Sequence, residues 1–129
     1  MKSTYLKSVI GVLILLFTSF NGCEKEKLLA TACGIDNPDR NIPWLANRLY
    51  SIDAAALPEI QRVDLYEYHS EELIRIVWES DYQLYDAPNG SVYDCEGNLL
   101  YTCGGNQPID SCSIVINKSQ YIGRIWEKE

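Results

Sequence analysis

The cysteines are the residues of this 129-residue chain whose type and spacing most clearly indicate chemistry. A cysteine sulfur can carry a lipid, form a disulfide or ligate a metal ion. The sequence contains five: Cys23, Cys33, Cys95, Cys103 and Cys112. Cys23 differs from the others because it closely follows an uncharged apolar run. An odd count in an exported chain predicts one cysteine with a separate role and an even set that pairs.

The segment before Cys23 has the layout of a secretory signal peptide. Lys2 and Lys7 form a basic start, and residues 9–20 form the apolar run. A membrane-spanning helix needs about 20 apolar residues, so this run is short for a permanent span. We expect residues 1–22 to be removed on export, with a retained N-terminal anchor helix as the alternative.

Residues 20–23 resemble the lipobox of bacterial lipoproteins, in which a small residue, here Gly22, precedes the cysteine that receives lipid. The resemblance implies a thioether-linked diacylglycerol and an acylated amine on Cys23. Each methylene buried in the bilayer contributes about 0.8 kcal/mol, so several chains anchor a protein almost permanently. Cys33, after residues 29–32, is a competing candidate. The charged residues 24–27 disfavour it, because they separate it from the apolar run.

The charged stretch after Cys23 is similar to surface-export signals in lipoproteins of Bacteroidota-type bacteria. This resemblance implies a location in the cell envelope, at the outer membrane or cell surface rather than the inner membrane. The membrane, through lipid on Cys23, is then the first expected partner.

Export makes disulfides the natural use of the four remaining cysteines. Cys103 and Cys112 are close in sequence and are separated by a glycine-rich turn, so we favour this pair. Cys33–Cys95 would then tie the N-terminal segment to the sheet. A zinc site is the alternative, but no C-x-x-C spacing occurs and His69 is the only histidine. We expect no metal and no cofactor.

The apolar periodicity predicts one helix followed by strands. The helix begins at Pro43, is capped by Asn41 or Asp39, and ends near Ala56. Strands are predicted over residues 61–69, 73–79, 81–86, 92–95, 99–102 and 121–127, with a short helical or extended piece at 113–117.

These elements predict an α+β fold, in which one N-terminal helix packs on an antiparallel sheet of about five or six strands stabilised by disulfides. We expect residues 1–22 to be a signal peptide, 23–32 a tether, and 33–129 a single small domain.

Composition narrows the functional classes. The formal net charge of −7 disfavours nucleic acid as a partner, because its phosphates would be repelled. Trp44, Trp78 and Trp126 are either structural or part of a sugar-binding or protein-binding surface.

Sequence motifs that would indicate a catalytic site or a calcium site are weak in this chain. His69 would have to serve any Ser/His/Asp site, and no G-x-S-x-G motif occurs. Asp94, Glu96 and Asn98 alternate as in a calcium loop, but Gly97 comes too early for one and fits a hairpin turn better.

Two stretches, residues 33–45 and 92–112, resemble small Bacteroidota lipoproteins and exported domains of unknown function. That resemblance implies nothing about activity. We predict a lipid-anchored, non-enzymatic binding or accessory module of the cell envelope, whose partner is an unknown envelope protein or glycan. A secreted-type inhibitor or glycan-binding domain is the alternative, and a small hydrolase is the third.

Overall fold

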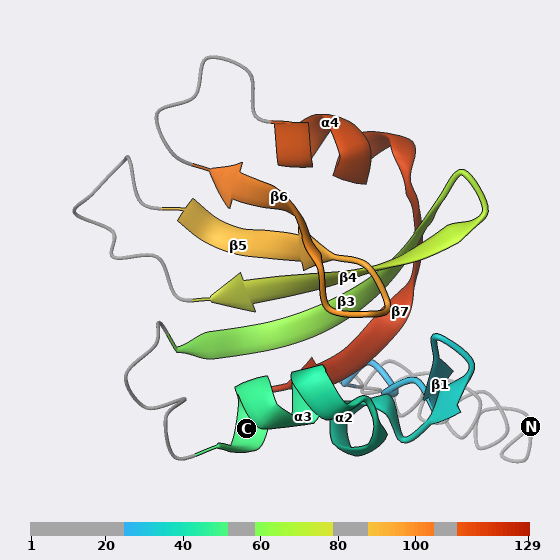
Figure 1. Cartoon of the computed structure of the whole chain (residues 1–129), viewed down its shortest axis with the longest axis vertical. Coiled ribbons are helices and arrows are strands. Elements are labelled where there is room, and N and C mark those ends of the chain that lie inside the picture. The colour runs from blue at the N-terminus through green and yellow to red at the C-terminus, as the bar shows by residue number, and fades with distance from the viewer. Residues whose placement is uncertain (1–24, 52–58, 79–87, 105–110) are drawn as a thin grey trace, which may run out of the picture.

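The computed structural model describes residues 25–51, 59–78, 88–104 and 111–129. Over these residues the protein is mostly β (Figure 1). Its main element is an antiparallel five-stranded sheet in the order β6-β5-β4-β3-β7. The strands are β3 (Ile60–Tyr68), β4 (Glu71–Trp78), β5 (Pro88–Tyr93), β6 (Leu99–Gly104) and β7 (Gln120–Glu127).

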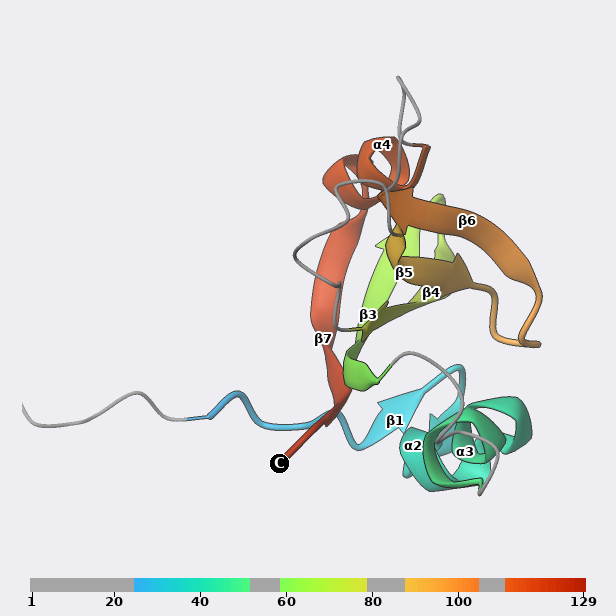
Figure 2. The same cartoon turned by 90° about the vertical axis from the view of Figure 1, so that its left-hand side faces the viewer.

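The sheet is a meander from β3 to β6, after which the chain returns to the opposite edge. Helix α4 (Ser111–Lys118) makes this return and delivers β7 to its place beside β3. Figure 2 shows α4 at one end of the sheet, between the edge strands β6 and β7. The β3–β4 turn is tight, because His69 and Ser70 both adopt positive φ angles as a two-residue hairpin loop requires.

The N-terminal part forms a second, smaller unit. Strands β1 (Thr31–Ala32) and β2 (Ile35–Asp36) make a two-stranded sheet, followed by the short helices α2 (Pro38–Asn41) and α3 (Pro43–Tyr50). Ile42 separates the helices in an extended conformation, since a residue before proline avoids the helical region.

The predicted α+β fold, with a single N-terminal helix packed on the sheet, is wrong. A two-stranded sheet and two short helices stand where one helix was expected. Neither proposed cap holds α3, because Ile42 occupies the cap position, and the Asn41 side chain instead donates to the Asp36 carbonyl. The expected helix end near Ala56 and the expected strand at 81–86 lie outside the described residues.

Both faces of the main sheet are covered. Successive strand residues point to opposite faces, so the neighbours Leu73 and Ile74 join different apolar clusters. One cluster packs the N-terminal part on the sheet and the other packs α4 on it. The first contains Ala32, Ile42, Leu45, Val63, Leu65, Ile74, Ile76, Tyr93 and Ile125, and the second contains Leu73, Val92, Cys103, Cys112 and Val115.

Two disulfides connect these layers, which confirms the prediction of disulfide bonding. They are the favoured pairings, Cys33–Cys95 and Cys103–Cys112. The first closes a loop with a sequence separation of 62 and the second one of 9. In the chain-entropy model these loops correspond to stabilisation of about 4 and about 2.5 kcal/mol. Cys33–Cys95 fixes the N-terminal part, and Cys103–Cys112 fixes α4 to β6.

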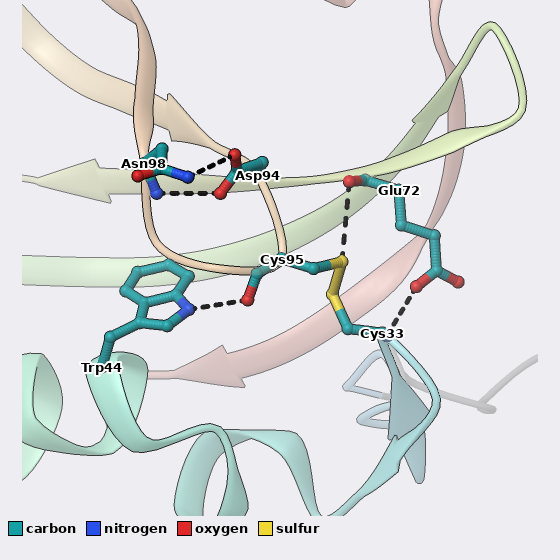
Figure 3. Close-up of a disulfide and its surroundings, with 6 residues drawn as sticks. All are labelled: Cys33, Trp44, Glu72, Asp94, Cys95 and Asn98. Carbon is teal, nitrogen blue, oxygen red and sulfur yellow. Dashed lines mark hydrogen bonds between the residues drawn. A yellow bond between two sulfur atoms is a disulfide. The ribbon is translucent and has the colours of Figure 1, made fainter.

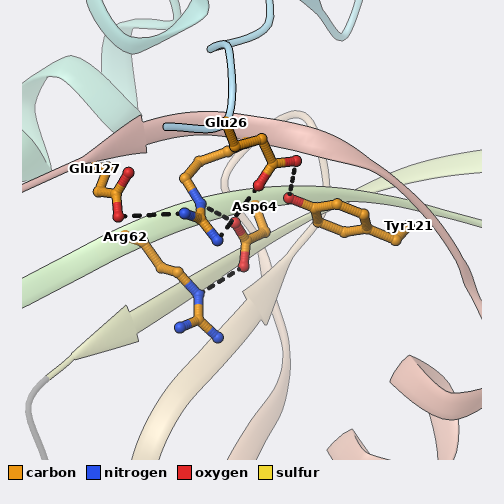
Figure 4. A network of polar contacts seen from close by, with 6 residues as sticks. Glu26, Arg62, Asp64, Tyr121 and Glu127 are labelled. Atoms are coloured by element: carbon orange, nitrogen blue, oxygen red, sulfur yellow. Dashed lines mark hydrogen bonds and ion pairs between the residues drawn. The ribbon is translucent and has the colours of Figure 1, made fainter. Parts of the chain in front are cut away.

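A buried carboxylate joins β3 to β7 (Figure 4). Asp64 is 2% exposed and accepts hydrogen bonds from Arg62 at 2.9 Å and from Arg124 at 3.1 Å. Arg124 also pairs with Glu26 at 3.5 Å and with Glu127 at 3.2 Å. Burial of a charge is costly unless it is paired, so the two guanidinium groups are what make Asp64 tolerable at this position.

Replacing Asp64 therefore has a large predicted effect. Asp64→Asn keeps the size of the side chain but leaves Arg124 facing a neutral amide, and we expect a loss of about 3 kcal/mol in the free energy of unfolding. Urea denaturation measures it. Glu67→Gln, at an exposed position on the same strand, is the control and should change stability by less than about 0.5 kcal/mol. Equal free energies of unfolding for Asp64→Asn and Glu67→Gln would show that the ion pairs of Asp64 contribute little to stability.

Candidate functional site

The predicted lipidation site, Cys23, lies outside the described residues, but the chain just after it contacts the sheet. The backbone N–H of Leu29 donates to the carbonyl of Arg124 on β7, at 2.7 Å. The Tyr121 hydroxyl donates to the Glu26 carboxylate, also at 2.7 Å. Partial burial, and then this hydrogen bond, raises the pKa of Tyr121, so the phenol remains a proton donor. Residues 26–29, the docked segment, therefore lie against β7.

A glycine lets the docked segment approach closely. A Cβ atom on Gly123 would lie 2.8 Å from the Leu29 side chain, which is closer than real contacts allow. Beyond this segment, β1 begins at Thr31. Within the expected tether, residues 23–32, the contacts of the described part begin at Glu26 and continue through Leu29 to β1.

The Cys33–Cys95 disulfide is the centre of a polar junction (Figure 3). The Cys33 backbone N–H donates to the Glu72 carboxylate, and the Trp44 indole N–H donates to the Cys95 carbonyl at 2.9 Å. The junction joins the β1–β2 turn, α3, β4 and the β5–β6 hairpin, which are far apart in sequence. Its polar groups bond one another, so the junction holds the N-terminal part in place.

The same junction is the one grouping of possible metal ligands found among the described residues. Ligand atoms of Cys33, Glu72 and Cys95 lie within 4.8 Å of one another. Zinc binds thiolate sulfur, whereas these two sulfurs are covalently joined. The arrangement therefore serves as a structural cross-link.

A hollow of about 220 Å³ opens beside this junction, and it is lined by Trp44, Asn47, Arg48, Tyr93 and Gly97. The Trp44 and Tyr93 rings are 5.2 Å apart, and the Arg48 guanidinium lies 5.8 Å from the Tyr93 ring centre. Arg48 also donates to the Tyr93 hydroxyl at 3.2 Å. Aromatic rings, an amide and a guanidinium together suit a small polar ligand with an apolar face, such as a sugar. We call this site the Trp44 hollow.

The β5–β6 turn forms one wall of the Trp44 hollow. The Asp94 carboxylate accepts hydrogen bonds from the Asn98 backbone N–H at 2.8 Å and from its side chain at 2.9 Å. The side-chain bond in particular lowers the pKa of Asp94. The turn therefore loses stability as the pH falls through this lowered value. Gly97 has a φ of 90°, so the carboxylates once compared with a calcium loop belong to a hairpin turn.

Acidic side chains gather on the other side of Cys95. Glu71, Glu72, Asp94 and Glu96 line a second hollow of about 370 Å³ with it. Two of these four carboxylates are already engaged, because Asp94 bonds within the turn and Glu72 bonds Cys33.

The remaining candidate residues are spread over the molecule. Trp44, Trp78 and Trp126 are all partly buried against the same apolar cluster, so they do not form an exposed aromatic patch. His69 is exposed in the β3–β4 turn, where its ring lies 4.0 Å from that of Tyr68. The structure thus does not bring His69 to the Trp44 hollow.

Sequence reasoning missed the residues that complete the site. Asn47 and Arg48 line the Trp44 hollow, but neither is among the candidate residues that the sequence indicated. A signal was available, because Trp44 and Arg48 are four residues apart and so share one helix face. Asp64 and Arg124 were also missed. No local signal marked them, because a charged residue between Val63 and Leu65 is the usual pattern of a strand with one face toward solvent.

No protein-family model matches this chain, and no similar curated protein or solved structure was found. Among the described residues, no helix has the length and apolar character needed to cross a bilayer.

Gly97 tests the packing of the Trp44 hollow. A Cβ atom there would lie 2.6 Å from Trp44 and the φ angle is positive, so Gly97→Ala should lower the free energy of unfolding by about 2 kcal/mol or more. Gly34→Ala is the matched control. Its φ is also positive, at 70°, but open space surrounds it, and only the conformational cost of about 1 kcal/mol is expected. Thermal unfolding of both variants is the measurement, and equal losses would contradict the close contact.

Proposed function

We propose that this protein is a lipid-anchored, non-enzymatic binding or accessory module of the cell envelope, attached through Cys23. The observation that carries the proposal is the use of the cysteines. Four of the five are paired in two disulfides, and Cys23 is left over next to the apolar run. Lipid attachment is the chemistry that this context favours, as the lipobox-like residues 20–23 also indicate.

The resemblance to Bacteroidota-type lipoproteins supports a place at the outer membrane or cell surface rather than the inner membrane. The docked segment sets how close to the domain a lipid on Cys23 would lie. An extended residue spans about 3.5 Å, so Glu26 lies within about 10 Å of the Cys23 Cα atom. A domain held this closely remains at the bilayer and is suited to capturing a partner there.

A binding role also agrees with the bonding of the candidate groups. The Trp44 indole N–H and one Arg48 N–H are engaged in holding the fold, and Glu72 is engaged with Cys33. Side chains that are fixed in this way present a rigid surface to a ligand, and their N–H groups that are not used within the fold can donate hydrogen bonds to it. They are poorly placed to exchange protons during a reaction.

The anchor is tested by the mass of the full-length protein after expression in a bacterium that processes lipoproteins. We expect a membrane-bound chain that begins at residue 23 and carries the added mass of diacylglycerol and an acyl group. Cys23→Ala should abolish the added mass and leave the domain unanchored. Lys25→Ala, at an exposed position, is the control and should be modified normally. Retention of residues 1–22, or lipid on Cys33, would refute the proposal.

A second candidate function, glycan binding, is favoured by the Trp44 hollow. Its two aromatic rings, Arg48 and Asn47 combine stacking surfaces with hydrogen-bond donors, which is the chemistry that sugars need.

Titration with neutral and uronic-acid oligosaccharides, followed by amide NMR shifts, tests this candidate. We expect saturable shifts around Trp44 and Tyr93, and the double variant Asn47→Ala/Arg48→Ala should weaken binding roughly tenfold or more. Lys118→Ala, an exposed change on α4, is the control and should bind normally. Unsaturable shifts, or unchanged affinity in the double variant, would exclude the hollow as a sugar site.

A further inference from the structure

Three large apolar side chains remain exposed around the docked segment. Leu28 is 46% exposed, and Tyr121 and Ile122 on β7 are 43% and 39% exposed. Two of them flank residues that join the segment to β7, because Leu28 precedes Leu29 and Ile122 precedes Gly123. Tyr121 itself donates to Glu26. Leu28, Tyr121 and Ile122 thus belong to the docked segment or to the part of β7 that it contacts, and we call these three residues together the anchor face.

The position of the anchor face relative to Cys23 decides what it contacts. Three peptide steps separate Cys23 from Glu26, so acyl chains on Cys23 would hold Glu26 within about 10 Å of the lipid attachment point. Tyr121 is bonded to Glu26 and is drawn to the same depth. The headgroup region on each side of the hydrocarbon core is of comparable thickness, about 5–8 Å.

The chemistry of the anchor face suits this depth. A tyrosine places an apolar ring and a polar hydroxyl together and is enriched at membrane interfaces, while Leu28 and Ile122 supply apolar contact. In the sequence just before Leu28, residues 24–27 alternate as Glu-Lys-Glu-Lys, and their charges sum to zero. The surface therefore favours the boundary of a zwitterionic bilayer and does not require anionic headgroups.

We propose that the anchor face lies in the interfacial region of the bilayer and orients the domain on the membrane. The inference rests on the proposed anchor at Cys23. The docked segment holds the anchor face toward the lipid on Cys23. The domain therefore has a fixed orientation on the bilayer, which a flexible lipid link alone would not give. The Trp44 hollow, built on α3 and the β5–β6 turn, keeps a constant position relative to the membrane.

Quenching of an introduced tryptophan by brominated phosphatidylcholine tests the orientation. The lipoprotein is reconstituted in zwitterionic vesicles as Ile122→Trp, with Leu99→Trp on the opposite edge strand as control. Leu99 is 57% exposed, so both positions tolerate a large side chain. After subtraction of the parent protein, emission from position 122 should fall roughly two-fold and emission from position 99 should not. Equal quenching at both positions, or none at 122, overturns the proposal.

A second preparation separates this inference from the anchor itself. The unlipidated chain beginning at Cys23 is coupled through that thiol to a maleimide-linked dialkyl lipid and examined with the same two variants. Selective quenching at position 122 in this preparation supports the anchor face even if the cellular protein lacks lipid, in which case the proposed anchor alone fails. Quenching that does not distinguish the two positions refutes the anchor face even if cellular lipidation is found.

Discussion

The buried carboxylate of Asp64 is the constraint on which the arrangement of the chain depends. A charge at this depth requires cationic partners, and Arg62 and Arg124 supply them from β3 and β7. The pairing holds the returning strand β7 beside β3. It also fixes Arg124, whose carbonyl receives the Leu29 N–H and whose guanidinium reaches Glu26. One buried charge thus connects the closing strand of the sheet to the segment that follows the proposed lipid.

The N-terminal part is held at two places that reinforce each other. At one, the docked segment lies against β7. At the other, the Cys33–Cys95 disulfide and the Trp44 indole attach the β1–β2 turn and α3 to the β5–β6 hairpin. Between them, Leu45 is completely buried in the cluster below the sheet. A chain of this size buries a modest core, so covalent and charged links carry much of its cohesion.

The sequence predicted the strands better than the fold class, for physical reasons. Alternating residues such as Ile74 and Ile76 mark a strand locally, and the spacing of Cys103 and Cys112 limits their pairing. The N-terminal part was misjudged because a proline can start a helix and also force Ile42 into an extended conformation. The hollow and the ion-pair network depend on contacts between residues distant in sequence, which local patterns do not encode.

The amide hydrogen exchange of Leu29 tests the central claim most directly, since a rigid link between anchor and sheet requires its bond to Arg124. The account predicts slow exchange, comparable to that of amides paired between β3 and β7, in the chain that begins at Cys23. Exchange at the rate of an unstructured peptide, with the β3–β7 amides still protected, would show that the segment is a free tether and would contradict the account.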